Sequence, residues 1–333
     1  MNETSIFSQS WRYVREHKSL WGLGFLNSTA AVLGVIAIYA GLTAALMASP
    51  GLLARYLRLP DLNLAYWPFP SWVIWVALFT LIVWFLLWLV GLAARGGLIT
   101  AADDIEEGRR PSGGESFGRG WRRAPVLALM SLIVFLPVIA LYAVGQVALW
   151  LALPDFTQVT SENFLSGFTT LYSISMCLTC GLYFLLIFLQ FIHAFAYRGV
   201  MLRELGVWSS ISHGWRVLRD KPGEIIPLAM IFGGLMVAFY GIAYAVFIAF
   251  YLAGLFSFLF STSAEGPPVV ALFFIGIIFL LAMAALFFVM VVLGAWRSTA
   301  FTIGYRRWSA PAAPSPIPVA PNADPPDLNI NTP

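Results

Sequence analysis

Six long stretches of the chain carry apolar residues almost without interruption, and short polar segments separate them. Each stretch exceeds the roughly 20 residues that a helix needs to cross about 30 Å of hydrocarbon. Lipid offers no partners for backbone N–H and C=O groups, so stretches of this length are expected to be helices. The pattern predicts an all-α, polytopic transmembrane helical bundle with spans at roughly 21–49, 71–94, 125–153, 168–197, 225–260 and 268–296.

Two segments of the chain fit this scheme less simply. The fifth stretch is longer than an untilted span needs at about 1.5 Å per residue, so we expect it to tilt, to break near its glycines, or to lie partly along the outer surface. The path of residues 250–262 stays open. Residues 309–333 contain eight prolines and no aromatic residue, which predicts a disordered cytoplasmic tail after a membrane domain of residues 1–308.

Composition and charge add an orientation. The chain is 60% hydrophobic and 11% charged, against about 25% charged in soluble domains. Of its 19 Lys and Arg residues, 17 fall on one side of the predicted spans, and Arg55 and Arg58 fall on the other. The positive-inside rule therefore predicts a multi-pass plasma-membrane protein with both termini cytoplasmic. The net charge of +3 is explained by topology, and we expect no nucleic-acid partner.

A short motif occurs three times, each time before a pair of spans. An apolar residue is followed four residues later by Trp-Arg, and by another apolar residue or Ala at the seventh, so that one helical face is apolar. The residue before each Trp is Ser or Gly, which allows another backbone to approach. The copies are FSQSWRYV (7–14), FGRGWRRA (117–124) and ISHGWRVL (211–218).

Amphipathic helices of this kind lie in the membrane interface, with indoles among headgroups and cations near phosphates. They could bind headgroups or gate a path, but interfacial anchoring is the favoured interpretation, because aromatic and basic residues are enriched at that boundary. The predicted anchors are Trp11, Arg12, Trp121, Arg122, Trp215 and Arg216.

A second motif, A-x-R-[GS], closes each pair of spans. Together the two motifs define three parallel units, at about 5–100, 115–203 and 209–304, each with an amphipathic helix and two spans. If the units pack around an axis, one arginine from each converges on a vestibule suited to phosphate or carboxylate. The alternative is that these side chains only extend to the interface. The arginines are Arg95, Arg198 and Arg297.

Other polar residues give weaker indications. The run DDIEE (103–107) is interpreted as a solvated helix face in which Glu106 pairs with Arg110, and Cys177 and Cys180 as packing residues. Gln190 and His193 are expected to form hydrogen bonds between helices. Because no span carries a charge at its middle and neither a Walker nor an H-E-x-x-H motif occurs, we predict no catalytic residue, no metal site and no cofactor.

The segment RGGLITAADDIEEGRRPSGGESFGRGWRR (95–123) resembles an uncharacterised prokaryotic group of polytopic proteins similar to the membrane domain of glycerophosphodiester phosphodiesterases. The resemblance implies a membrane fold over most of residues 1–308. It carries over no catalytic residue, since the phosphodiesterase chemistry belongs to a separate soluble domain.

Two functions remain after these steps. The first is a non-enzymatic scaffold or accessory subunit whose partners are the lipid bilayer and another membrane protein. The second is a transporter or lipid-handling protein that binds an anionic lipid headgroup at the arginine cluster.

Overall fold

The computed structural model describes residues 3–47, 71–152, 161–260 and 269–309, and within these ranges the only regular secondary structure is helical. Six of the helices are long and apolar enough to cross a membrane, which confirms the prediction of a multi-pass helical protein. The predicted Pro-rich tail beyond Ser309 lies outside the described residues. The helices are α1 (Glu3–Glu16), α2 (Lys18–Met47), α4 (Ser71–Glu106), α5 (Gly113–Ala152), α6 (Ser161–Arg203), α7 (Val207–Asp220), α8 (Pro222–Phe260) and α9 (Val269–Ser309).

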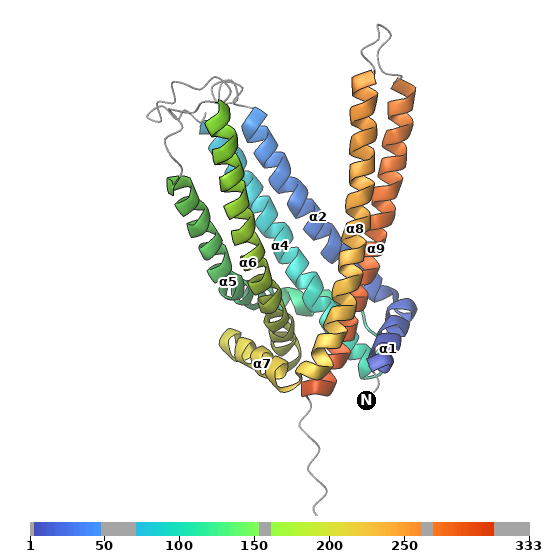
Figure 1. The fold of residues 1–333 in the computed structure, drawn as a ribbon. Coiled ribbons are helices and arrows are strands. Elements are labelled where there is room, and N and C mark those ends of the chain that lie inside the picture. Colours follow the sequence, from blue (N-terminus) through green and yellow to red (C-terminus); the bar gives the residue numbers. More distant parts are fainter. Residues whose placement is uncertain (1–2, 48–70, 153–160, 261–268, 310–333) are drawn as a thin grey trace, which may run out of the picture.

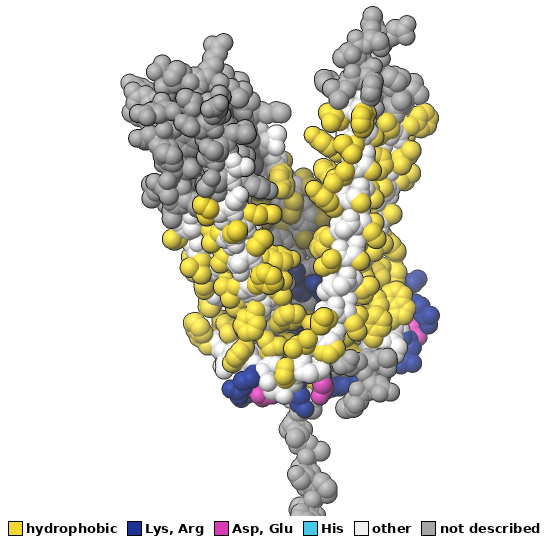
Figure 2. Space-filling model, viewed as in Figure 1, with side chains coloured by type: hydrophobic (Ala, Val, Ile, Leu, Met, Phe, Trp, Pro, Cys, Tyr) yellow, Lys and Arg dark blue, Asp and Glu magenta, His cyan; other side chains and the backbone are white. Residues whose placement is uncertain are grey.

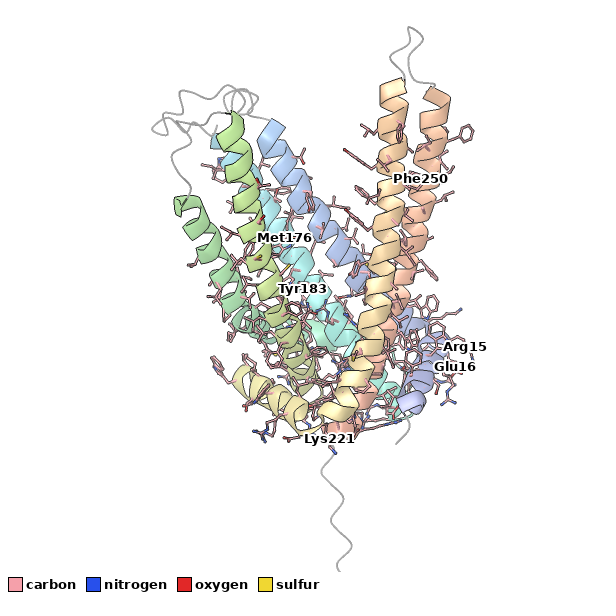
Figure 3. All side chains as sticks on the ribbon, viewed as in Figure 1. Arg15, Glu16, Met176, Tyr183, Lys221 and Phe250 are labelled. Carbon is pink, nitrogen blue, oxygen red and sulfur yellow. The ribbon has the colours of Figure 1, made fainter. Side chains whose placement is uncertain are left out.

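The helices form two arms that diverge from a common base (Figure 1). One arm contains α2, α4, α5 and α6, and the other contains α8 and α9. The base consists of α1, α7 and the adjoining ends of the long helices. Charged residues such as Arg15 and Lys221 lie at the base, whereas Met176, Tyr183 and Phe250 lie on the arms (Figure 3).

Small residues bring the helices of the base into close contact. Gly120 of α5 packs directly on the carbonyl oxygen of Ala93 in α4, and a Cβ atom on Gly214 of α7 would lie 2.7 Å from the carbonyl oxygen of Ile192 in α6. Ser10 of α1 is buried, and its hydroxyl accepts a hydrogen bond from the Trp296 indole at 3.0 Å. The close approach of another backbone is therefore observed at Gly120 and Gly214, whereas Ser10 contacts a side chain.

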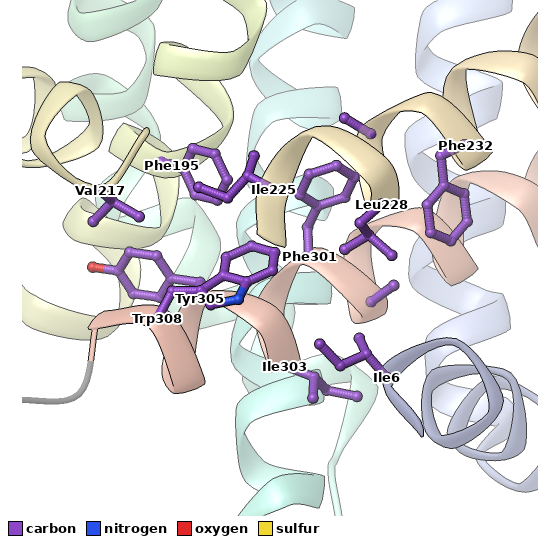
Figure 4. Close-up of a cluster of buried hydrophobic side chains, with 12 residues drawn as sticks. Ile6, Phe195, Val217, Ile225, Leu228, Phe232, Phe301, Ile303, Tyr305 and Trp308 are labelled. Atoms are coloured by element: carbon purple, nitrogen blue, oxygen red, sulfur yellow. The ribbon is translucent and has the colours of Figure 1, made fainter. Parts of the chain in front are cut away.

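An apolar core fastens the two arms to each other at the base (Figure 4). It draws side chains from α1, α6, α7, α8 and α9, including Ile6, Phe195, Val217, Ile225, Phe232, Phe301, Tyr305 and Trp308. Higher on the arms, large apolar side chains such as Phe184, Val237 and Leu280 are exposed, as expected for helices that face lipid. Contacts between protein side chains thus concentrate in the base.

Two details differ from the expected scheme. The second amphipathic segment is not a separate helix, because α5 continues through it into the span. Helix α1 ends at Glu16 and α7 ends at Asp220, each in a turn with charged residues. No such turn follows Arg123, because Ala124 is the next residue and the helix continues. In addition, α8 is one continuous helix, so the expected alternative of a break at its glycines is wrong.

Candidate anion-binding site

The three repeated arginines lie within long helices and not at their ends. Arg95 is followed by eleven further residues of α4, Arg198 by five of α6, and Arg297 by twelve of α9. All three helices run from the arm tips toward the base. Because Cβ atoms tilt toward a helix N-terminus, the three side chains lean toward the arms and away from the base.

The arginines converge although they come from three different helices. Electrostatic repulsion acts between Arg198 and both of the others, and also between Arg95 and Arg297. Figure 2 shows a hollow between the arms, with Lys or Arg atoms at its floor and apolar side chains on its walls. We call Arg95, Arg198 and Arg297 the arginine centre.

Arg198 occupies a buried position within this centre. Its exposed fraction is 5%. One terminal nitrogen donates to the carbonyl oxygen of Ala194 at 2.6 Å, and the other donates to that of Ser298 on α9 at 2.9 Å. The guanidinium also lies over the ring of Phe301 at 5.6 Å, while its Nε has no hydrogen-bond partner among the described residues. Arg198 therefore joins α6 to α9 through carbonyl oxygens, without a counter-charge.

Arg95 and Arg297 keep exposed surface. Many protein atoms surround Arg297, as expected for a side chain recessed in a hollow, and the hydroxyl of Tyr240 on α8 is near enough to interact with it electrostatically. Within the described ranges, no salt bridge joins any residue of the arginine centre to an acidic side chain. Tyr240 was not among the predicted site residues, and nothing in the sequence distinguishes it from the other tyrosines.

The acidic residues of α4 that are nearest to Arg95 form ion pairs on the base side of the arginine centre. Asp104 is buried and pairs with Arg119 and, at 2.7 Å, with Arg109; this hydrogen bond is the main cause that raises the pKa of Arg109. Arg306 of α9 pairs with the two flanking acids, Asp103 at 3.0 Å and Glu107 at 3.1 Å.

The expected pair between Glu106 and Arg110 is wrong, because Glu106 instead accepts a hydrogen bond from Gln9 of α1 at 3.0 Å. The interpretation of DDIEE as a solvated face is also wrong. The run links α4 to α1, α5 and α9.

A buried hydrogen bond supports the centre from α5 and α6. The imidazole Nε2 of His193 lies 2.8 Å from the hydroxyl of Ser131, and the ring also packs against Phe135 and Tyr197. Arg95 is near enough to act electrostatically on His193. The expected role of His193 in bonding between helices is observed. Cys177 and Cys180 are exposed on α6, so their interpretation as packing residues is wrong.

The predicted interfacial anchors surround the base. Trp11, Trp121 and Trp215 are all partly exposed, and the arginines that follow them are exposed as well. The ring of Trp11 lies 4.9 Å from that of Trp296, the residue before Arg297. Arg297 therefore lies at the level of Trp11, one of the predicted anchors. Arg12, Arg122 and Arg216 have no described link to the arginine centre.

The chemistry available at the centre is anion binding. Guanidinium groups bind phosphate and carboxylate oxygens in bidentate fashion, and like charges that repel one another are stabilised by a shared anion. In the described part of the chain, no group of three or more His, Cys, Asp or Glu side chains is placed to hold a metal ion. No protein-family model matches the chain, and comparison with curated proteins and with solved structures finds no significant match.

Proposed function

We propose that this protein is a non-enzymatic lipid-handling membrane protein that binds an anionic headgroup at the arginine centre. The observation that carries the proposal is the convergence of three guanidiniums from three helices with no described acidic partner. Arg198 is buried without a counter-charge, and Arg95 and Arg297 are exposed beside a hollow with apolar walls, where uncompensated positive charge is costly. A bound phosphate or carboxylate would offset that cost.

A cyclic arrangement of the three sequence units would explain why the arginines meet. In support, Gly120 of the second unit packs on Ala93 at the end of the first, and Gly214 of the third packs on Ala196 at the end of the second. Ser10 of the first unit bonds Trp296 at the end of the third. Each contact joins the residue before the repeated Trp to the A-x-R-[GS] motif of the preceding unit, so equivalent arginines would face a common axis.

The proposed orientation places the base at the cytoplasmic face of the plasma membrane, in accord with the positive-inside rule. A reporter fused after Arg307 tests this, since one that works only in the cytoplasm should be active there. Activity of a reporter that works only outside the cell would overturn the orientation. Relationship to the glycerophosphodiester phosphodiesterase membrane-domain group remains a proposal that rests on the sequence motifs.

The binding proposal is tested by native mass spectrometry of detergent-purified protein supplied with phosphatidylglycerol and phosphatidylcholine. Wild-type protein should retain phosphatidylglycerol preferentially, and the double variant R95Q/R297Q should lose at least tenfold in that retention. The control is R12Q/R216Q, which removes the same charge from exposed anchor positions. Equal retention by R95Q/R297Q and wild type would reject the headgroup site and leave the scaffold role as the better proposal.

A further inference from the structure

A narrow cavity of about 100 Å³ extends from the arginine centre along the interface of α2 and α4. Its walls are mostly small or apolar, and its small residues are Ala30, Ala31, Gly34 and Gly91. A Cβ atom on Gly34 would lie 3.4 Å from the Trp84 ring, and one on Gly91 would lie 3.6 Å from Ala30, so these glycines let the two helices pack closely beside the cavity. The stacked indoles of Trp84 and Trp88, with centroids 6.1 Å apart and planes 6° from parallel, line the cavity as well. We call this cavity the α2–α4 slot.

The slot has one polar end and one apolar end. The two helices are antiparallel, and Ala30 lies opposite Gly91, so Asn27 of α2 falls near the level of Arg95 on α4. Asn27 and Arg95 are the polar residues of the lining. From Arg95 to Trp84 the lining follows α4 for eleven residues, about 16 Å at 1.5 Å per residue. A charged floor below an apolar channel matches a ligand that has an anionic head and a hydrocarbon chain.

The base side of the arginine centre is closed by packed side chains. Below Arg95, the residues Leu98, Ile99 and Ala101 are buried in α4, and below Arg297 the residues Ala300 and Ile303 are buried in α9. The centre is instead open toward the hollow between the arms, whose walls are apolar (Figure 2). A ligand that approaches through the hollow must tolerate an apolar surrounding, which favours a lipid over a water-soluble anion.

The depth of the centre fits a lipid that stays in its own leaflet. Trp11 contacts Trp296 beside Arg297, and interfacial tryptophans lie at the level of the headgroups. A phospholipid at that depth has its phosphate near the arginines and its chains directed along the arms. It would need neither to turn over nor to leave the leaflet in order to bind.

The hollow opens sideways between α6 and α8. On the opposite side α2 and α9 are packed together, with ring pairs Trp21–Phe288 at 5.4 Å and Phe25–Phe287 at 5.5 Å. Figure 2 looks into the opening between α6 and α8. Tyr240 of α8 is near enough to Arg297 to interact with it electrostatically, so a tyrosine borders the arginine centre on the α8 side.

We propose that the ligand is a phospholipid of the leaflet next to the base, which enters between α6 and α8, seats its phosphate at Arg95 and Arg297, and lays the first few methylene groups of one acyl chain in the α2–α4 slot. This inference rests on the proposed headgroup site and specifies what that site binds. Charge complementarity selects the anionic head, and the apolar slot selects the chain.

The variant Ala31→Phe tests the acyl-chain part, because it fills the slot and leaves the arginines unchanged. It should lower phosphatidylglycerol retention in native mass spectrometry at least tenfold, and glycerol phosphate, which lacks chains, should displace the lipid from wild-type protein poorly. Ala77→Phe is the matched control, since Ala77 is an exposed residue of α4 that does not line the slot. It should retain lipid like wild type.

The outcomes separate the two proposals. Two results would overturn the acyl-chain inference and leave the headgroup site standing. The first is loss of retention in R95Q/R297Q with full retention in Ala31→Phe. The second is displacement of the lipid by equimolar glycerol phosphate. Unchanged retention in R95Q/R297Q would overturn both.

A second measurement avoids any folding defect of Ala31→Phe. Phosphatidylglycerol with a photoreactive group on one acyl chain should label wild-type protein mainly at residues 27–34 and 84–92. Labelling spread evenly over the lipid-facing arms would contradict the inference.

Discussion

The base and the arms contain parts of the same helices, yet they are stabilised differently. In α6, Phe195 and Val200 are fully buried near the base, whereas Tyr183 and Phe184 on the arm are exposed. In the base, close backbone contacts, ion pairs and an apolar core join the helices. On the arms, apolar surface is left for lipid. The arginine centre lies at the boundary, where protein packing ends and the hollow begins.

This difference indicates what each region contributes. The base fixes where three cations meet, because its helices cannot shift without breaking packed contacts. The arms leave apolar surface and an opening beside those cations. A rigid charged floor and lipid-facing walls are the two features that the proposed ligand requires. Substitutions with the same chemistry should therefore have unequal effects in the two regions.

The largest effect is expected for Gly120→Ala in the base, and it should exceed that of any polar substitution considered below. The added Cβ would strike the carbonyl oxygen of Ala93 and lie 2.8 Å from the backbone nitrogen of Gly97, and neither backbone atom can move aside cheaply. Overpacking of this kind should destabilise the protein by about 2 kcal/mol or more, measured by thermal unfolding in detergent.

Two control glycines have nothing within 4 Å of an added Cβ: Gly118 on the same helix and Gly181 on an arm. Each should tolerate Ala or gain up to about 1 kcal/mol from its higher helix propensity. If Gly120→Ala unfolds at the same temperature as these controls, the close contact between α4 and α5 does not define the base.

The sequence predicts the arms better than the base. Apolar length alone gives the six spans, since lipid imposes the same requirement on every spanning helix. A hydropathy pattern does not predict that α4 continues to Glu106 and α9 to Ser309, because these segments are charged. In the structure, partners from other helices neutralise those charges. The missing turn after Arg123 is visible in the sequence, although only the structure gives its consequence for α5.

The sequence predicted which arginines form the candidate site, but not the contacts that each of them makes. Repetition identifies Arg95, Arg198 and Arg297 as equivalent positions, but it cannot distinguish them. Arg198 is buried because Ser298 and Phe301 of α9 happen to receive its guanidinium, a contact between segments about 100 residues apart. Asp104 was misinterpreted because burial by α5 removes it from solvent, which no local pattern indicates.

The second effect in size is expected for Asp104→Asn. The neutral amide would leave Arg119 and Arg109 without their buried carboxylate partner. Because both arginines keep solvent exposure, the loss should destabilise the base by about 1–2 kcal/mol. Chemical unfolding followed by tryptophan fluorescence measures this change.

The matched substitution on an arm is Thr179→Val. The Thr179 hydroxyl is exposed and bonds only the Ser175 carbonyl of its own helix at 2.7 Å, so its loss should change stability by less than about 0.5 kcal/mol. Equal effects of the two substitutions would mean that polar contacts do not distinguish base from arms.

The smallest effect is expected from pH, and it concerns the attachment of α7 to the base. The His213 ring bonds the Tyr305 hydroxyl of α9 at 2.8 Å. Burial, followed by the charges of Arg203 and Arg216, lowers the pKa of His213 below its ordinary value of 6.5. The unfolded chain therefore takes up the proton first as the pH falls, so the contribution of neutral His213 is fully present above about pH 6.5 and is lost progressively below it.

Unfolding temperatures at pH 7.5 and 5.5 measure this loss, and His213→Gln should reduce the difference between them. The comparison is made between the two proteins so that pH effects from the rest of the chain cancel. Since α7 belongs to the base alone, helix content by circular dichroism should stay nearly constant in both proteins over this interval. If the pH difference is unchanged in His213→Gln, the bond to Tyr305 does not hold α7 in place. If helix content falls in parallel with stability, the arms depend on the base more than their exposed surfaces indicate.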